Sequence, residues 1–242
     1  MVRRGLCESR SAAAHAIEAK SVLVNGSLAD KASRLVAAGD AIVLTVQPRF
    51  VSRGGEKLDA ALNSFDIETE GVDALDLGAS TGGFTDCLIQ RGAASVVAVD
   101  VGHNQLHERL RQDPRVRSFE KLHLRDADPQ LIGGPFKLVV CDLSFISLRQ
   151  VARDVARNCA PSADVILLVK PQFEAGKAEV SKTQGVIRDD SVRLRTLNEV
   201  VTEYESLGFT MVAVIDSPVP GASGNVEWLV HLKAPATEGK RQ

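Results

Sequence analysis

Two charged residues each close an apolar run in the second half of the chain, Asp142 after Leu-Val-Val-Cys and Lys170 after Ile-Leu-Leu-Val. Such runs predict buried β-strands. Because ligands bind beyond the carboxyl ends of the strands in an open α/β sheet, we expect both side chains at one ligand-binding edge. A lysine held there can accept a proton from a weak acid such as a sugar hydroxyl. A purely structural ion pair between Lys170 and Asp142 fits the same spacing, so spacing alone leaves two interpretations.

Lys57 and Glu227 are two further charged residues in unusual places. Lys57 follows Arg-Gly-Gly-Glu in the first turn of a predicted helix that ends near Phe65, and Arg53 lies just before that helix. Cations are unfavourable at a helix N-terminus, so their placement calls for an anionic neighbour. A solvated basic turn is equally compatible with this stretch. Glu227 lies between apolar residues of a predicted hairpin, in Asn-Val-Glu-Trp-Leu-Val.

A turn of small residues, Gly-Ala-Ser-Thr-Gly-Gly at 78–83, follows a predicted strand over 73–77 and precedes a predicted helix over 84–91. Backbone N–H groups in such a turn can hold an anionic ligand group, and the helix dipole adds to their effect. The next predicted strand, over 95–100, ends in Asp100, where a βαβ unit holds a ribose diol. The alternative is a tight turn that merely packs a strand against a helix.

The spacing within this turn favours one class of ligand. Dinucleotide-binding turns follow Gly-x-Gly-x-x-Gly, whereas here Ser80 stands at the second glycine position and Asp76 precedes Gly78. S-adenosylmethionine (SAM) has an amino-acid end, whose ammonium group would pair with a protein carboxylate and whose own carboxylate would accept from backbone N–H groups. The turn therefore suits SAM, and its spacing disfavours the dinucleotide of an NAD-dependent oxidoreductase. The predicted cofactor-binding residues are Asp76, Gly78, Ala79, Ser80, Gly82, Gly83, Phe84, Asp100, Val101 and Asp142.

Basic residues are concentrated at the N-terminus. Residues 1–57 contain nine Lys and Arg against five Asp and Glu, whereas the remainder contains 20 against 26. This asymmetry predicts that the N-terminal part contacts nucleic acid, although a solvated face would have the same composition. The predicted RNA-binding residues are Arg3, Arg4, Arg10, Lys20, Arg49 and Arg53.

The elements that must position these residues alternate between strand and helix from Asp73 onward, which is typical of a doubly wound parallel sheet in an α/β protein. Two final strands have no helix between them. The predicted strands are 73–77, 95–100, 115–119, 137–142, 164–169, 209–216 and 226–232, and the predicted helices are 84–91, 103–112, 147–158 and 188–207.

The N-terminal residues predict a separate, smaller αβ module. A helix ends near Ala19, and strands follow over 22–24 and 41–46. Pro48 forbids the continuation of a central strand and so marks a linker. We therefore expect a first domain over 1–47, a linker over 48–52, a second domain over 53–233 and a flexible tail over 234–242.

Composition excludes several classes of protein. The four cysteines form no Cys-x-x-Cys pair, so neither a disulfide framework nor a zinc site is expected, and we predict no metal. No run approaches the length of a membrane span, and the Arg-containing N-terminus has no apolar core behind it. These features predict a cytoplasmic protein.

The N-terminal module resembles the S4 type of RNA-binding domain. The similarity rests on Ser9-Arg10, Ile17, Val-Leu-Val-Asn-Gly at 22–26 and Gly39-Asp40. That family usually begins with a longer first helix, so we expect the helix here to be truncated.

The larger domain resembles the FtsJ-like ribose 2′-O-methyltransferases, whose Lys-Asp-Lys-Glu tetrad matches Lys57, Asp142, Lys170 and Glu227 in order. Val-Ser-Arg-Gly-Gly-Glu-Lys, Leu-Gly-Ala-Ser-Thr-Gly-Gly-Phe-Thr, Asp-Leu-Ser-Phe-Ile-Ser, Val-Lys-Pro-Gln-Phe-Glu and Ser-Gly-Asn-Val-Glu are similar to the TlyA family, often labelled hemolysin. The resemblance implies a class I (Rossmann-like) SAM-dependent methyltransferase sheet that ends in an antiparallel hairpin.

The resemblance also implies transfer of a methyl group from SAM to a cytidine 2′-hydroxyl in ribosomal RNA. Shorter members of the family modify 23S rRNA and longer ones also 16S rRNA, and the short ends here are similar to the shorter form. We expect Lys170 to receive the hydroxyl proton, Asp142 and Glu227 to orient it, and Lys57 to orient the ribose of an extruded nucleotide. The alternatives are a non-catalytic RNA-binding protein associated with ribosomes and a cytolytic protein.

Overall fold

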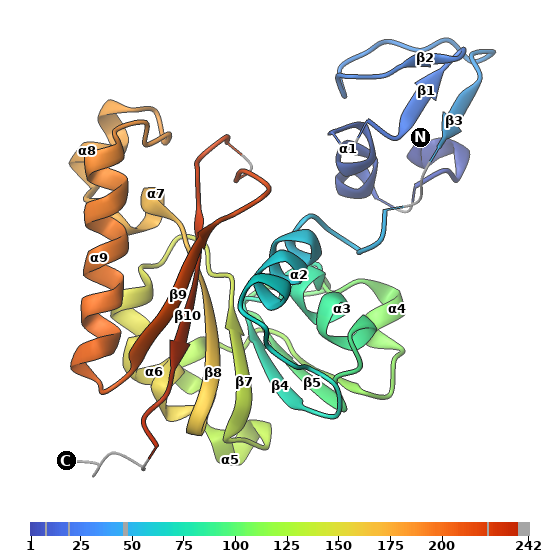
Figure 1. The fold of residues 1–242 in the computed structure, drawn as a ribbon. Coiled ribbons are helices and arrows are strands. Elements are labelled where there is room, and N and C mark those ends of the chain that lie inside the picture. The colour runs from blue at the N-terminus through green and yellow to red at the C-terminus, as the bar shows by residue number, and fades with distance from the viewer. Residues whose placement is uncertain (8, 19, 46–47, 222, 237–242) are drawn as a thin grey trace.

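The computed structural model describes residues 1–7, 9–18, 20–45, 48–221 and 223–236, and it forms a small N-terminal domain and a larger α/β domain (Figure 1). The seven strands of the larger domain are β4 (Asp73–Leu77), β5 (Ser95–Val99), β6 (Val116–Phe119), β7 (Phe136–Cys141), β8 (Cys159–Val169), β9 (Thr210–Asp216) and β10 (Trp228–Lys233).

These strands form one mixed sheet in the order β6-β5-β4-β7-β8-β10-β9. The five strands from β6 to β8 are parallel, and β10 pairs antiparallel with both β8 and β9. The predicted parallel sheet with a closing antiparallel hairpin is therefore confirmed. Successive strands of the chain are added outward from β4 to β6 on one side and from β7 to β8 on the other. Because this direction of addition changes between β4 and β7, a ligand crevice is expected beyond their carboxyl ends.

Helices cover both faces of the sheet (Figure 1). Alternate residues of each parallel strand face opposite sides, so Leu75 and Leu77 pack in the same core as α6 and α9, whereas Ala74 packs in the core of α2 and α3. The helices are α2 (Gly54–Ser64), α3 (Gly83–Gln90), α4 (Glu108–Arg111), α5 (Pro129–Ile132), α6 (Ala152–Arg157), α7 (Pro171–Glu174), α8 (Lys177–Lys182) and α9 (Asp190–Ser206), with 3₁₀ turns η2 (Leu124–Asp126) and η3 (Leu148–Val151).

Some predicted boundaries are wrong for local reasons. The helix expected over 103–112 is only α4, because Asn104 has a φ of +54° and the His107 side chain caps a later start by accepting from the Arg109 N–H. The helix expected over 147–158 begins as a 3₁₀ turn capped by Ser147. The helices α5, α7 and α8 were not predicted, since each is too short to show a periodic pattern.

The small domain contains η1 (Val2–Arg4), α1 (Arg10–Glu18), β1 (Val22–Val24), β2 (Ser27–Leu28) and β3 (Ile42–Leu44). Its antiparallel sheet has the order β2-β1-β3. A small core of Ala16, Val22, Val24 and Ala29 joins α1 to this sheet. The strand predicted over 41–46 is confirmed over 42–44, and the last position of that prediction lies outside the described residues.

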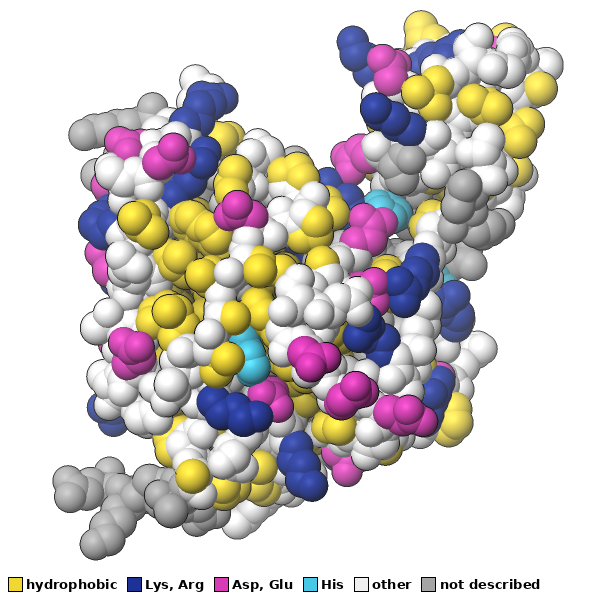
Figure 2. Space-filling model, in the orientation of Figure 1, with side chains coloured by type: hydrophobic (Ala, Val, Ile, Leu, Met, Phe, Trp, Pro, Cys, Tyr) yellow, Lys and Arg dark blue, Asp and Glu magenta, His cyan; other side chains and the backbone are white. Residues whose placement is uncertain are grey.

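The two domains meet where α1 lies against the start of α2. Arg53 Nη1 pairs with Glu18 Oε2 at 2.8 Å, and His15 Nε2 lies 3.2 Å from Glu56 Oε1. Figure 2 shows a hollow between the small domain and the body, with charged side chains on both sides. The S4-like helix therefore borders the same space as the N-terminus of α2.

The beginning of the predicted flexible tail is fixed. The Ala234 N–H donates to the Ala163 carbonyl at 2.9 Å, and the Ser162 N–H donates to the Pro235 carbonyl at 2.9 Å. Ala234 is also buried. The tail boundary predicted at 234 is therefore too early, and residues 237–242 of that prediction lie outside the described residues.

Candidate active site

The four predicted catalytic residues line one cavity of about 600 Å³ at the carboxyl ends of the strands. They come from α2, from the residues directly after β7 and β8, and from the residue directly before β10, so up to 170 residues of chain separate them. The glycine turn after β4 and part of α1 line the same cavity. The fold thus brings the tetrad, the turn and the small domain to one place.

Lys170 and Asp142 form the first ion pair of the site. Lys170 follows the last residue of β8 and Asp142 follows β7, and these strands are neighbours in the sheet. Lys170 Nζ lies 2.5 Å from Asp142 Oδ1 and donates to Ser144 Oγ at 3.0 Å. Its side chain is 11% exposed, so the ammonium is nearly enclosed yet faces the cavity.

Lys57 and Glu227 form the second ion pair. Lys57 Nζ donates to Glu227 Oε2 at 2.5 Å, and their side chains are 9% and 2% exposed. This carboxylate is the anionic neighbour that a lysine in the first turn of α2 requires. The sequence predicts an anionic neighbour for Lys57 but does not identify Glu227, because it does not show that the chain returns to α2 just before β10.

Glycines allow this close assembly at two points. A Cβ on Gly83, at the start of α3, would lie 2.9 Å from the Gly55 backbone nitrogen, so the first turns of α2 and α3 meet backbone to backbone. A Cβ on Gly78 would lie 2.5 Å from the Asp142 carbonyl oxygen, and Gly78 has a φ of +85°. Larger residues there would separate Lys57 and Asp142 from the turn.

A second cavity, of about 730 Å³, adjoins the first on the side of β5. Asp100 lies at its edge and accepts hydrogen bonds from the Ser80 N–H at 2.8 Å and the Gly102 N–H at 2.6 Å. Apolar side chains that the sequence reasoning missed also line it: Leu122, Leu124 and Leu143. A carboxylate beside an apolar slot can accept from the ribose hydroxyls of a nucleoside, and residues of the glycine turn line both this slot and the cavity that holds the tetrad.

Of the ten predicted cofactor-binding residues, eight line one or both cavities, namely Gly78, Ala79, Ser80, Gly83, Phe84, Asp100, Val101 and Asp142. Gly82 instead lies against Leu106 and Leu110, where a Cβ would collide with Leu110. Asp76 lines neither cavity. Contact between any of these residues and a cofactor stays a prediction.

The Asp76 carboxylate belongs to β4, two residues before the glycine turn, and lines neither cavity. It is fully buried, and Oδ2 accepts the Thr85 hydroxyl proton at 2.6 Å from α3. Burial raises the pKa of Asp76 to about 7, and the nearby carboxylates Asp142 and Asp100 add to the rise while the Thr85 hydrogen bond opposes it. The Thr85 bond ties Asp76 to the first turn of α3, while Oδ1 is buried without a hydrogen-bond partner among the described residues.

Phe145 is a prominent cavity residue that sequence reasoning missed. It lines both cavities, its ring lies 5.1 Å from that of Phe173, and the residue is 91% exposed. Its φ of +66° is costly for an aromatic residue, because the left-handed region suits glycine and asparagine. An exposed ring held in a strained backbone beside Lys170 offers a surface on which a base can stack.

The predicted RNA-binding residues are divided between exposed groups and structural contacts. Arg3, Arg10 and Lys20 are exposed on the small domain. Arg4 donates to the carbonyls of Ala37, Ala38 and Asp40 and so holds that loop. Arg49 pairs with Asp59 at 2.7 Å and lies over the Phe50 ring, and Arg53 pairs with Glu18 at the cavity wall. No RNA contact of these residues is tested by the structure.

Within the described ranges, no group of three or more His, Cys, Asp or Glu is placed to hold a metal ion. No helix in that same part of the chain has the length and apolar character needed to cross a bilayer.

Comparison with known proteins gives consistent results. Residues 50–234 match the family described as FtsJ-like methyltransferase, and residues 1–42 match the S4 domain. The 16S/23S rRNA (cytidine-2′-O)-methyltransferase TlyA of Mycobacterium tuberculosis is 46% identical over 96% of this chain and 87% of its own. Hemolysin A of Brachyspira hyodysenteriae is 41% identical over 94% and 95%, respectively. A solved structure from Streptococcus thermophilus, also described as a hemolysin, has a TM-score of 0.78 and 39% identity over 97% of this chain and 86% of its own.

Proposed function

Because this chain belongs to the FtsJ-like methyltransferase family, in the S4-containing form represented by TlyA, we propose that it methylates the 2′-hydroxyl of a cytidine in ribosomal RNA, with SAM as the methyl donor. We propose 23S rRNA as its first substrate and 16S rRNA as a possible second one. A ribosomal substrate would place the enzyme in the cytoplasm, and no metal is required by this chemistry.

The observation that carries this proposal is the convergence of the tetrad. Four charged side chains from distant segments meet as two ion pairs on the wall of one cavity, where three of the side chains are at most 11% exposed and that of Asp142 is 25% exposed. Burying four charges is costly, so a purely structural role would be served better by apolar residues of similar volume. The adjoining slot with Asp100 and apolar side chains supports SAM as the second ligand.

SAM supplies an electrophilic methyl group when it is bound. In the proposed arrangement Asp100 holds the ribose of SAM. The Thr81 and Gly83 N–H groups hold its amino-acid carboxylate, because the other N–H groups of the 78–83 turn already donate to Val99, Asp100 and Ala79. The chain then has to align the RNA hydroxyl with the donor and remove one proton. Alignment alone can supply a large part of the rate, because the reacting atoms must lie close together and in line.

Lys170 is the proposed proton acceptor. In its neutral form Lys170 Nζ receives the proton of the 2′-hydroxyl as the ribose oxygen bonds to the methyl carbon and the carbon–sulfur bond breaks. Asp142 Oδ1, at 2.5 Å, stabilises the ammonium that this transfer creates, and Ser144 helps to fix its position. Asp142 therefore assists the base without contributing a proton itself.

Lys57 and Glu227 are proposed to orient the target ribose from a position next to the first pair, since Glu227 precedes Trp228, which pairs with Val169 just before Lys170. Each neutralises the other, which allows both to stay almost buried without a net charge. Lys57 can donate to a ribose or phosphate oxygen, and Glu227 can accept from a hydroxyl. A nucleotide stacked in a helix would not reach them, so the target base has to be extruded.

The direct test uses purified protein, radiolabelled SAM, and 23S and 16S rRNA from cells that lack this gene. We expect label in the RNA with the wild type, loss of at least 100-fold with Lys170→Ala, and wild-type rates with Lys137→Ala, an exposed lysine on β7. Mapping of 2′-O-methyl groups identifies the nucleotide. Near-normal transfer by Lys170→Ala, with SAM binding intact, would show that another group takes the proton.

A further inference from the structure

Asp142 and Lys170 stand at the last positions that the sheet fixes. Pairing between β7 and β8 ends with Cys141 opposite Leu167, but the Asp142 N–H still donates to the Leu77 carbonyl at 3.0 Å, and Val169 still pairs with Trp228 of β10. Beyond these residues one loop continues through Ser144 to η3, and the other leads from Lys170 into α7. The sheet therefore fixes the backbone as far as the two residues, whereas the loops that follow them need other contacts to hold them together.

The side chain of Glu174, at the end of α7, connects these two loops. It is buried, with 3% of the residue exposed. Its Oε2 accepts the Ser147 hydroxyl proton at 2.5 Å, and its Oε1 accepts the Leu148 N–H at 2.7 Å. One carboxylate four residues after Lys170 thus holds the segment that begins five residues after Asp142.

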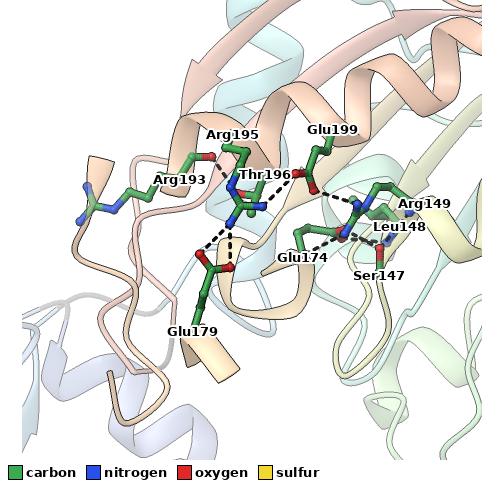
Figure 3. Close-up of polar contacts among 9 residues, drawn as sticks. All are labelled: Ser147, Leu148, Arg149, Glu174, Glu179, Arg193, Arg195, Thr196 and Glu199. Atoms are coloured by element: carbon green, nitrogen blue, oxygen red, sulfur yellow. Dashed lines mark hydrogen bonds and ion pairs between the residues drawn. The ribbon is translucent and has the colours of Figure 1, made fainter. Parts of the chain in front are cut away.

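Arg149 strengthens this connection and extends it to α9 (Figure 3). Its guanidinium donates to Glu174 Oε2 at 3.4 Å and to the Glu174 carbonyl at 2.8 Å, and it pairs with Glu199 at 2.8 Å. Arg195 in turn joins Glu199 to Glu179 of α8. The loops are therefore attached to the longest helix of the domain rather than to each other alone.

We propose that Glu174 is a positioning residue, which clamps the loop after β7 to the loop after β8 and so keeps Lys170 aligned with Asp142 and the ribose hydroxyl. Glu174 lines neither of the two cavities described above, so it acts through the loops and not on the substrate. This inference rests on the proposed function, because alignment matters only if Lys170 takes the proton.

The donor pattern explains why a carboxylate is needed here. All the groups that face Glu174 are donors, namely the Ser147 hydroxyl, the Leu148 N–H and the Arg149 guanidinium. A carboxylate accepts from all of them, whereas an amide would oppose one of them with its own N–H. Burial raises the pKa of Glu174, and the hydrogen bonds from Ser147 and Leu148 together with the charge of Arg149 offset only part of that rise. Glu174→Gln keeps the shape and removes one acceptor.

The experiment compares full-length wild type, Glu174→Gln and the matched control Glu179→Gln. The control changes a carboxylate of the same network whose contact, among the described residues, is with Arg195. Methyl transfer to 23S rRNA is measured with saturating SAM, well below the unfolding temperature. We expect kcat to fall about 10- to 100-fold in Glu174→Gln, because small misplacements of reacting groups have effects of this size. The KM for SAM should stay within about twofold, and the control should behave as wild type.

Hydrogen–deuterium exchange of the amides in 143–149 supplies a readout independent of activity. Exchange there should be faster in Glu174→Gln than in Glu179→Gln, because one anchor of the loop is lost. If Glu174→Gln does not fold, Ser147→Ala removes a single donor of the clamp. Its kcat should fall about 10-fold, the lower end of the range for one hydrogen bond to a charged group.

Unchanged exchange in 143–149, or a kcat of Glu174→Gln within twofold of the control, overturns the clamp. Equal losses in kcat and in SAM affinity also overturn it, since they indicate general disruption. If the wild type itself transfers no methyl group, the proposed function fails instead, and the exchange measurement alone then decides whether Glu174 holds the loop.

Discussion

Asp76→Asn should change the pH dependence of stability by an amount that follows from its burial. Burial raises the pKa of Asp76 to about 7, whereas the ordinary value is 3.8. Between these values the folded protein holds a proton that the unfolded chain has released, so the free energy of unfolding falls as pH rises. The favourable contribution is complete below about pH 4 and is lost as pH passes about 7.

The magnitude follows from the size of the shift. A difference of about three pKa units corresponds to on the order of 4 kcal/mol, at 1.36 kcal/mol per unit. Asparagine is neutral throughout and can still accept the Thr85 hydroxyl proton, so it avoids this loss. The stability of Asp76→Asn relative to wild type should therefore increase by roughly 4 kcal/mol from pH 4 to pH 8.

Urea denaturation at four or five pH values between 4 and 8 measures this difference. The control is Asp73→Asn, at the exposed start of the same strand, which removes a carboxyl group without the effect of burial. A difference between Asp76→Asn and wild type that stays constant over this pH range would refute the argument. It would mean that Asp76 is ionised in the folded protein despite its burial.

Three further outcomes are expected. Asp100→Ala should weaken SAM binding about 10- to 100-fold by calorimetry, because a charged acceptor for the ribose is lost, and an unchanged Kd would exclude Asp100 from the site. Phe145→Ala should change the free energy of unfolding by less than about 0.5 kcal/mol, since the residue is exposed. The same change should raise the KM for RNA several-fold, because base stacking contributes about 1–3 kcal/mol. A normal KM would argue against stacking. Glu227→Ala should lower the free energy of unfolding by about 3–5 kcal/mol in thermal or urea unfolding, because the ammonium of Lys57 is left buried without a partner, and a loss below 1 kcal/mol would show that this ammonium reaches water.

The positions of the catalytic candidates could be predicted because strand ends are visible in a single sequence. Asp142 and Lys170 follow apolar runs, and parallel strands present their carboxyl ends at one edge of a sheet. The glycine turn was visible for a similar reason, since Gly78 and its neighbours follow a strand directly. Even the burial of Asp76 was accessible in principle, because it alternates with Leu75 and Leu77 and so shares the face of Ala74, which α2 and α3 cover.

Other features could not be predicted, because they depend on contacts between distant segments. Nothing near Arg49 indicates Asp59 as its partner, and nothing near Arg53 indicates Glu18, so both appeared free to bind RNA. Short helices such as α7 leave no periodic signal, and the role of Glu174 becomes visible only when Ser147 lies beside it.

The sequence by itself thus indicated the order of the strands and longer helices of the larger domain, the glycine turn, and Asp142 and Lys170 at two strand ends, since these are local patterns of polarity and size. Lys57 and Glu227 were matched to them through the family resemblance. The tertiary structure alone decided that the four residues form two ion pairs and that α1 borders the cavity. The physical reason is that burial and ion pairing depend on distances between side chains far apart in the chain, and those distances exist only after the sheet has assembled.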